Sequence, residues 1–511
     1  MRITNKIMQR NNLSNINTNK ILQDRLSTQM STEKKINRPS DDPVVAIRAL
    51  RLRSSVTEVT QYYSKNIPDA KSWLSVTEDA LHNLSEIITK MITQCTKGSS
   101  GELKTEDRQI ILEQLQALAD EVYSTGDADY AGRYVFTGYR TDTSLSFLNE
   151  TDLKYTITEQ LGKDSLDSIT FVDMGKLLDI NSSNFNDTNM AGITDTDVSA
   201  SEIYRIRLAY DNCDPDSVPT ITYTDPDTGT EVTLTATTIH SYDNPYAKVE
   251  DEGVVYVPET GELLLSKANY DKLMTVKDKE STTANEAEIR VTYEKSHWNK
   301  GDLRPEHYFA CTSEDADGNK IEYNSSYLEG NAERQDIEYD VGFNQTIRVN
   351  STADECFQHG IGRETADIIS AMQDVLDLEK IKTTLENLKK EYEGQDDKLE
   401  TIQNQLDAVE KALTYAKDKE QRLFESGITA FQKYLDDANL CITNCGTRSS
   451  KLSLIETRMQ NQKTTFETLK SENEDADITE VAIYLTSAEL TYEAALMATG
   501  KIMQTTLLNF I

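Results

Sequence analysis

The chain has 511 residues, long enough for about two to four domains. Its 53 lysines and arginines are outnumbered by 87 aspartates and glutamates, and the net charge of −34 makes nucleic acid and anionic membranes poor partners. Aromatic residues make up 7% of the chain, and no apolar run reaches the roughly 18 residues that a membrane span needs.

The N-terminal residues Met1–Lys6 lack the apolar core of a cleavable signal peptide. We therefore expect a cytosolic protein, or one exported by a route that reads no such signal. The six cysteines are scattered, and only Cys441 and Cys445 lie close enough to share a helix face. Because no second pair stands at zinc-ligand spacing, we expect isolated free thiols and no metal.

The first segment, Met1–Thr32, is predicted to form a weak helix. Six asparagines fall within its first nineteen residues, and asparagine side chains compete with helical hydrogen bonds. Its apolar residues are too sparse to bury enough surface alone. We expect this helix to be mobile in the free monomer and to need a partner helix.

The segment Ile36–Pro43 is predicted to end one helix and to begin another. It holds two prolines four residues apart, which cannot both lie inside a regular helix. Asp41 and Asp42 favour helix starts, and Pro43 suits a first helical position. We expect both aspartates to cap a helix over Val44–Arg53. An ordinary helix–helix connector explains the spacing equally well.

Helical spacing continues over Val44–Lys97, and a further helix is predicted from Thr105 to near Gly126. A turn then leads into Gly132–Gly138, which is predicted to hold an apolar, aromatic strand between its two glycines.

From about Leu153 the pattern changes to short alternating segments, which predict strands. The expected strands are Tyr155–Glu159, Ile169–Val172, Ile203–Tyr210, Thr220–Thr224, Glu231–Ala236, Val254–Val257, Glu262–Leu265, Ala287–Tyr293, Ile337–Val341 and Thr346–Val349. Residues Asp225–Gly229 and Pro258–Gly261 are predicted to be hairpin turns between pairs of them.

Helical periodicity returns near Arg363 and lasts almost to the end of the chain. Apolar residues follow a heptad pattern over Leu399–Ala416. We expect Cys445–Ser450 and the charged run Ser471–Asp477 to interrupt the helix. The last helix is predicted to begin at Ile478.

Apolar side chains at helical spacing in the two terminal segments are the candidate residues for subunit assembly. They are Ile3, Ile7, Leu13, Ile16, Leu22, Leu26, Ile478, Val481, Leu485, Tyr492, Leu496, Ile502, Met503, Leu507 and Phe510. The predicted fold is α+β and elongated, with long N- and C-terminal helices in a coiled-coil bundle and a β-rich middle domain inserted between them. The predicted divisions are terminal helices (1–40 and 477–511), a helical rod (41–152 and 351–476) and a variable β-rich outer domain (153–350).

These features resemble the flagellin superfamily, and within it the proteins of the hook–filament junction. The most specific part is the junction motif Asn37, Arg38, Pro39, Ser40, Asp41, Asp42 and Pro43. Flagellins typically show a proline-free version of this motif. Similar family segments are Gly132–Gly138, Ile347–Asn350, Gly446–Arg448 and Thr506–Ile511.

The resemblance implies a structural adaptor of the bacterial flagellum, located outside the cell. It implies a homo-oligomeric ring of about eleven subunits that joins the first hook-associated protein to flagellin. It also implies type III export without a cleavable signal, with a chaperone holding the C-terminal helix. Alternatives are flagellin itself, or a coiled-coil binding module whose β domain recognises a surface ligand. The two prolines argue against flagellin, whose subunits switch between two filament states.

The sequence holds no constellation that predicts catalysis. No two of its histidines stand at a spacing that metal ligands need. They are His82, His240, His297, His307 and His359. We therefore expect a protein that is not an enzyme and that binds no cofactor or metal.

Overall fold

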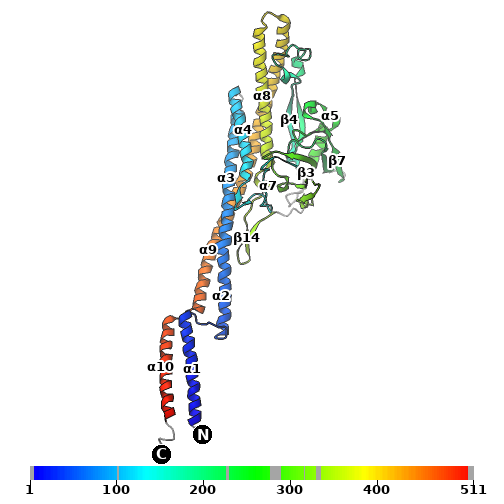
Figure 1. Cartoon of the computed structure of the whole chain (residues 1–511). Helices are drawn as coiled ribbons and strands as arrows, with labels where there is room; N and C mark the ends of the chain where they lie inside the picture. The colour runs from blue at the N-terminus through cyan, green and yellow to red at the C-terminus, as the bar shows by residue number, and fades with distance from the viewer. Residues whose placement is uncertain are drawn as a thin grey trace, which may run out of the picture. The chain divides into compact units, whose positions relative to one another are not determined.

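The computed structural model describes residues 5–100, 103–225, 229–276, 289–315, 317–329 and 335–504. Helices come first, strands follow in the middle third, and helices close the chain, which confirms the predicted α+β class (Figure 1). The chain divides into two compact units. Unit 1 comprises Met1–Ala70, Tyr339–Ile347 and Ser450–Ile511, and unit 2 comprises Lys71–Glu338 and Arg348–Ser449.

The long helices follow the predicted segments, except that the sequence pattern missed a break at residues 392–395. They are α1 (Asn5–Thr32), α2 (Pro43–Gln61), α3 (Ile67–Gly98), α4 (Thr105–Gly126), α8 (His359–Glu391), α9 (Asp396–Glu474) and α10 (Ile478–Gln504). The short helices are α5 (Val249–Glu252), α6 (Lys267–Thr275) and α7 (Ala353–Cys356).

The predicted helix over 44–97 is continuous except for one π turn, Tyr62–Asn66, between α2 and α3. Pro68 follows this turn directly. A proline lacks the N–H of a regular helical bond and clashes with the carbonyl four residues earlier. The wider π turn lets the helix pass this residue without ending.

The predicted interruption at Cys445–Ser450 is wrong, because α9 runs through it without a break. A glycine inside a helix costs about 1 kcal/mol relative to alanine. Burial on either side of Gly446 outweighs that cost: Cys441, Cys445 and Leu452 are all buried. The second predicted break is confirmed, since α9 ends at Glu474 and α10 begins at Ile478.

The strands of the middle third form two sheets and two small hairpins. One sheet has the order β4-β5-β10-β9-β8, and the other has the order β13-β12-β3-β11-β6-β7. The strands are β1 (Asp129–Tyr130), β2 (Arg133–Tyr134), β3 (Thr151–Leu161), β4 (Leu166–Asp173), β5 (Ser199–Arg207), β6 (Thr220–Thr224), β7 (Glu231–Thr235), β8 (Thr237–Thr238), β9 (Val254–Val257), β10 (Glu262–Leu265), β11 (Ile289–Trp298), β12 (Ala310–Glu314), β13 (Lys320–Tyr323), β14 (Glu338–Gly342) and β15 (Gln345–Arg348).

Each strand expected between 153 and 350 is present, and β9 and β10 form the predicted hairpin about Pro258–Gly261. The sequence pattern missed β8, β12 and β13. It also overestimated the strand in Gly132–Gly138, where only Arg133 and Tyr134 pair. Val135 and Phe136 are buried there without extending the ladder.

The heptad segment of α9 packs against α8, as the pattern predicts for two neighbouring helices. Its inner side chains Ile402, Leu406, Val409 and Leu413 share a core with α8 and with the loop around Phe185. This core belongs to unit 2 alone.

All six cysteines are free and buried, as expected. The expectation that they are isolated is wrong for one pair. Cys356 lies beside Cys441, and burial together with that neighbouring thiol raises the pKa of Cys356 well above its ordinary value. The thiols of Cys441 and Cys445 each donate to a main-chain carbonyl, that of Glu355 and that of Leu74.

Candidate assembly site

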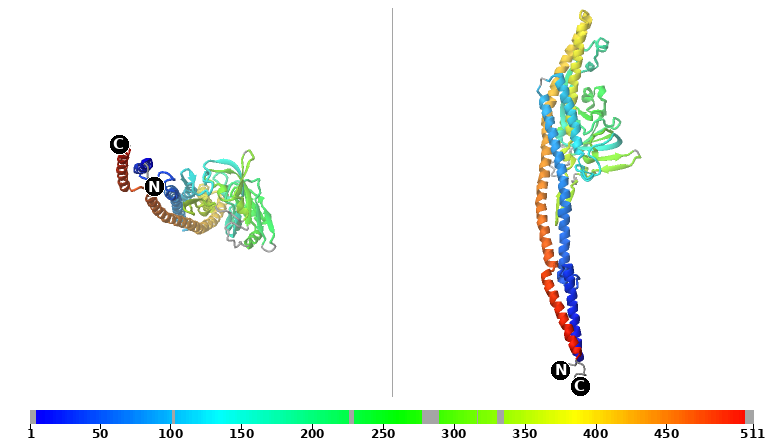
Figure 2. Two further views of the ribbon diagram at one scale, coloured as in Figure 1. Left: turned by 90° about the horizontal axis from the view of Figure 1, so that it is seen from below. Right: turned by 60° about the vertical axis from the view of Figure 1, so that its left-hand side comes forward.

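The two terminal helices, α1 and α10, lie side by side within unit 1 (Figures 1 and 2). Their shared core is small: Leu26 from α1 packs with Val481 and Ala488 from α10, and Ala476 and Leu485 border it. Three predicted assembly residues, Leu26, Val481 and Leu485, therefore hold the pair together. Ile16 and Tyr492 are half-buried.

Other predicted assembly residues point to solvent. Ile7, Leu13 and Leu22 of α1 are exposed, as are Ile478 and Leu496 of α10. The pair thus covers only part of its own apolar surface. An exposed set of large aliphatic side chains on adjoining helices is typical of an interaction surface.

The remaining predicted residues cannot be placed. Ile3, Leu507 and Phe510 lie outside the described residues. Ile502 and Met503 fall within α10, but their side chains are outside the described part.

A second apolar face of α10 was not among the predicted residues. Ile483, Leu490 and Met497 are 64%, 65% and 67% exposed. They are seven residues apart, so they lie along one side of the helix. A groove follows the same side, lined by Ala482, Ile483, Thr486, Ser487, Leu490, Thr491 and Ala494. Small side chains along it would let another helix approach closely.

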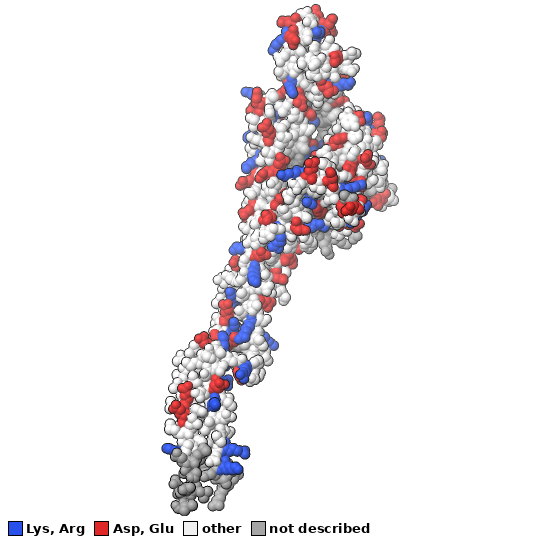
Figure 3. Space-filling view, in the orientation of Figure 1, with Lys and Arg blue, Asp and Glu red and all other residues white. Residues whose placement is uncertain are grey.

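The two terminal helices carry opposite charges. Along its described length α1 has the cations Lys6, Arg10, Lys20 and Arg25 and one acid, Asp24. The charged residues of α10 are three glutamates and one lysine. The surface over these helices is largely uncharged on the face that Figure 3 shows. Opposite signs favour pairing of α1 with α10 over pairing of either helix with its own copy.

The junction motif forms a turn that its two aspartates hold. Asp42 caps α2 as predicted, because its side chain accepts from the backbone N–H groups of Val44 (3.0 Å) and Val45 (3.1 Å), and Pro43 is the first helical residue. The prediction that Asp41 also caps this helix is wrong. Its carboxylate closes the turn instead, and accepts from the N–H groups at the start of the motif.

The donors to Asp41 are the backbone N–H groups of Arg38 (2.9 Å) and Asn37 (3.2 Å). These two hydrogen bonds lower the pKa of Asp41 below its ordinary value. Pro39 and Pro43 are both exposed, so they act through the backbone restrictions they impose and not through packing.

A second set of contacts, which we call the clasp, joins this turn to the turn between α9 and α10. Arg53 donates to both carboxylate oxygens of Glu474, through Nε (2.6 Å) and Nη2 (2.8 Å), and Glu474 is buried. This charged hydrogen bond raises the pKa of Arg53. The N–H of Lys35 donates to the carbonyl of Glu474 (2.7 Å), and Lys34 pairs with Asp475.

The clasp was not predicted from the sequence. Glu474 and Asp475 fall in the charged run that indicated only a break, and their partners lie more than 400 residues earlier in the chain. No local pattern signals such a pairing.

A further exposed apolar set follows the junction motif on α2. Val44, Ile47 and Leu50 are spaced three residues apart and are exposed, while Ala46 and Ala49 face inward. The candidate assembly surface of unit 1 therefore extends from the terminal helices past the turn.

No group of three or more His, Cys, Asp or Glu within the described ranges is arranged to hold a metal ion. Across those same ranges, none of the helices combines the length and apolarity that crossing a membrane requires.

The N-terminal part of the chain is similar in sequence to known proteins. Residues 3–141 match the model of the bacterial flagellin N-terminal helical region. Flagellar hook-associated protein 3 of Salmonella typhimurium is 30% identical over 146 residues, which are 28% of this chain and 45% of that protein. Flagellin of Clostridium tyrobutyricum is 28% identical over 122 residues, which are 24% of this chain and 32% of the flagellin.

Among solved structures, the flagellar junction protein of Legionella pneumophila aligns with 84% of this chain and 99% of its own. The identity is 12% and the TM-score 0.29. The sequence matches span less than half the length of the relatives. The predicted resemblance is confirmed to this extent: residues 3–141 of this chain are similar to the N-terminal helical region of bacterial flagellins, and a stretch of 146 residues is similar to hook-associated protein 3.

Proposed function

We propose that the protein is a structural component of the bacterial flagellum, and that it joins the hook, through the first hook-associated protein, to the flagellin filament. The observation that carries the proposal is the incomplete burial of the terminal helices. Val481 and Leu26 face each other within the pair, whereas Ile483, Leu490 and Met497 face outward. The similarity of 146 residues of this chain to hook-associated protein 3 supports the junction in particular.

Assembly is the simplest way to cover this apolar surface. A leucine or isoleucine that becomes fully buried contributes about 1.5–3 kcal/mol. Copies of the pair packed around a common axis would bury the outward faces of both helices, while the inner core stays as it is. A closed ring needs a head-to-tail interface of this kind, with two different faces on each subunit.

The division of the chain follows from this role. Residues 1–40 and 477–511 would form the axial core, 41–152 and 351–476 the helical rod, and 153–350 an outer β-rich domain. Before assembly, the outward face of α10 would suit an export chaperone, because a groove-forming apolar helix face is a common target for helix-binding partners. Export would use the flagellar type III route. The role is structural, with no catalytic step.

The junction motif favours the adaptor over a filament subunit. Three sets of contacts fix the turn. Asp41 closes it, Asp42 caps α2, and the clasp through Glu474 joins it to the turn between α9 and α10. The two prolines restrict the backbone further. A subunit that switches between two filament states would need a turn whose backbone can change conformation more easily than this one.

The test is a strain that lacks the gene. If the protein is the junction, cells keep their hooks and secrete flagellin into the medium as monomer, and the full-length gene restores filaments. A gene encoding residues 1–477 alone should not restore them, while Glu121→Gln, an exposed change on α4, serves as the control that should. Normal filaments in the deletion strain would contradict the proposal. Loss of flagellin from the medium as well as from the cell surface would point to a filament subunit.

A further inference from the structure

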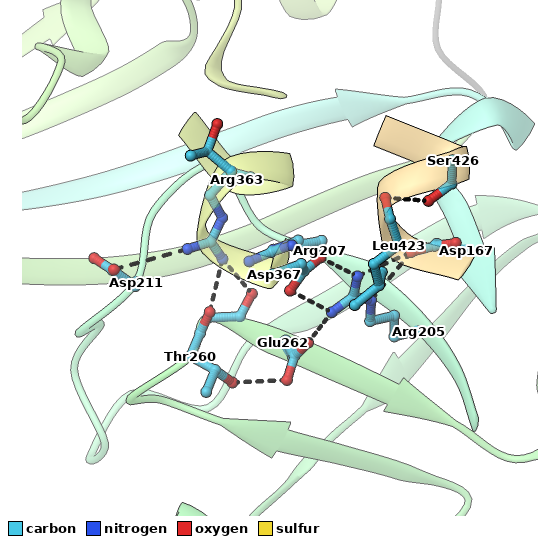
Figure 4. Close-up of polar contacts among 12 residues, drawn as sticks. Asp167, Arg205, Arg207, Asp211, Thr260, Glu262, Arg363, Asp367, Leu423 and Ser426 are labelled. Carbon is cyan, nitrogen blue, oxygen red and sulfur yellow. Dashed lines mark hydrogen bonds and ion pairs between the residues drawn. The ribbon is translucent and has the colours of Figure 1, made fainter. Parts of the chain in front are cut away.

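A pocket of about 950 Å³ opens within unit 2, between the sheet that contains β5 and the helices α8 and α9 (Figure 4). Its lining carries six cationic side chains together with seven carboxylates, so the position of each charge decides what the pocket can bind. Arg205 and Arg207 enter it from β5, and Arg363 enters it from α8. These three guanidiniums share one wall of the pocket.

Arg205 is fully engaged by the protein itself. Its side chain is 2% exposed and pairs with the carboxylates of Asp167 (2.9 Å), Glu262 and Asp367. The other oxygen of Glu262 accepts from the hydroxyls of Thr260 and Tyr246, both at 2.9 Å. The charges in this part of the network are paired with one another, and the contact of Arg205 with Asp367 holds the sheet against α8.

Arg207 is not compensated in the same way. Among the described residues its one ion-pair partner is Asp367, a carboxylate that Arg205 already shares, and its buried Nε donates to no acceptor there. Burial first, and then the neighbouring guanidiniums of Arg363 and Arg205, lower the pKa of Arg207 to about 9. The carboxylates of Glu262 and Glu364 favour its charged form, but they do not offset the burial and the two neighbouring guanidiniums, so Arg207 is compensated less fully than Arg205.

Arg363 is in a similar position. Its Nη2 donates to the carbonyls of Thr260 (2.7 Å) and Gly261 (3.2 Å), but its nearest carboxylate, Asp211, is 3.9 Å away. Its Nε is also buried without an acceptor in the described structure. The side chains of Arg207 and Arg363 keep 16% and 12% of their surface exposed, so part of each remains open to a ligand.

The wall that α9 contributes contains no acid. It presents Lys419, Arg422 and Lys433 together with the hydroxyls of Ser426 and Thr429. The carboxylates that pair with these cations, Asp374, Asp418 and Asp164, are not part of the pocket lining. An anion placed between Arg207, Arg363 and this wall would therefore meet guanidinium, ammonium and hydroxyl groups, while the carboxylates of Glu202, Asp211, Glu259 and Glu364 line other parts of the pocket.

From this arrangement we propose that the pocket binds a small ligand through an oxyanion group, a carboxylate or a phosphate, with Arg207 and Arg363 as its principal cationic contacts. Guanidinium groups bind both kinds of oxyanion through paired, charge-assisted hydrogen bonds. The hydroxyls on α9 and the size of the pocket leave room for a polar body the size of a sugar beside the anion. This site is independent of the proposed junction role, because none of its residues lies in unit 1.

The experiment is calorimetric titration of the full-length monomer with two probes, inorganic phosphate and glucuronate. We expect saturable binding of at least one probe, at one site per chain, with a dissociation constant of about 1 mM or tighter. Binding of phosphate alone, of glucuronate alone or of both distinguishes the source of the oxyanion. Arg207→Gln should weaken binding by about tenfold or more.

Two further variants test whether a loss of binding comes from the pocket itself and not from misfolding or from a general change in net charge. Ser426→Asp adds a carboxylate on the exposed α9 wall, where folding does not depend on the side chain, and it should weaken binding by a similar factor. Arg10→Gln on α1, in unit 1, removes the same charge from a residue that is not part of the pocket and should change binding less than twofold. The proposal is overturned if neither probe binds saturably, or if Ser426→Asp and Arg207→Gln bind as the unaltered chain does.

Discussion

The outward face of α10 offers the sharpest perturbation of assembly. We consider the triple variant Ile483→Gln, Leu490→Gln and Met497→Gln. Each of these side chains has about two thirds of its surface still exposed in the single chain. Full burial of such a side chain contributes about 1.5–3 kcal/mol, so the exposed part of each would add about 1–2 kcal/mol on assembly. The triple variant should lose about 3–6 kcal/mol per subunit interface.

The same variant should leave the monomer almost unchanged. Substitutions at exposed positions usually alter the free energy of unfolding by no more than about 0.5 kcal/mol, and glutamine is a good helix former. The matched control is Val481→Ala, which removes methyl groups from the buried α1–α10 core. This control should cost the pair about 1–2 kcal/mol while leaving the outward face intact.

The assay compares two measurements on each variant. Thermal unfolding of the purified monomer reports stability, and filament number in a strain that carries only the variant reports assembly. We expect the triple variant to unfold at the normal temperature and to leave cells without filaments. If these cells build filaments in normal number and the variant protein is incorporated, the outward face is not an assembly surface.

Three other predictions concern other parts of the chain. In His359→Gln, the free energy of unfolding should lose part of its acid sensitivity. Burial lowers the pKa of His359 to about 3, below its ordinary 6.5, so the unfolded state takes up the proton first. This group should therefore cost the native chain about 2 kcal/mol between pH 7 and pH 5, while His307, whose pKa burial also lowers, keeps its own contribution in the variant. Urea titrations at both pH values measure this, and equal losses in the variant and the unaltered chain would contradict it. Replacing Pro39 and Pro43 together with alanine should leave folding and export intact but weaken the junction, so that cells shed flagellin; normal filaments would show that the motif is only a connector. Hydrogen exchange on the monomer should show weak protection in α1 and α10, since their shared core is small, and strong protection in both would refute a pair that becomes ordered on assembly.

The sequence predicted the helices and strands well wherever a local pattern determines them. Period-two alternation located β6, β9 and β10 at their observed bounds, and the heptads of α9 identified the face that packs on α8. Those signals depend only on neighbouring residues. The order helices, strands, helices followed directly from them.

The sequence misled where a distant contact outweighs a local preference. Gly446 indicated a helix break, but α9 continues through this residue because Cys445 and Leu452 beside it are buried. Asp41 and Asp42 have equal capping propensities, and only the geometry of the turn assigns one to α2 and the other to the N–H groups of Asn37 and Arg38.

The candidate site was predictable only in part. Hydrophobic periodicity identified the terminal helices as assembly elements, but it could not tell the side chains that hold the pair together from those that face outward. Both sets lie at helical spacing. The clasp and the arginine pocket depend on residues brought together from distant segments, such as Arg53 with Glu474 or Arg207 with Asp367. No pattern within a short window contains that information.

The most direct test of the junction role is to locate the protein on intact flagella. Immunogold labelling with antibodies raised against the β-rich region 153–350 would show its position by electron microscopy. We expect the label to be confined to a narrow band where the hook meets the filament. Label distributed along the whole filament would identify a filament subunit, and absence of label from the flagellum would contradict the proposed function altogether.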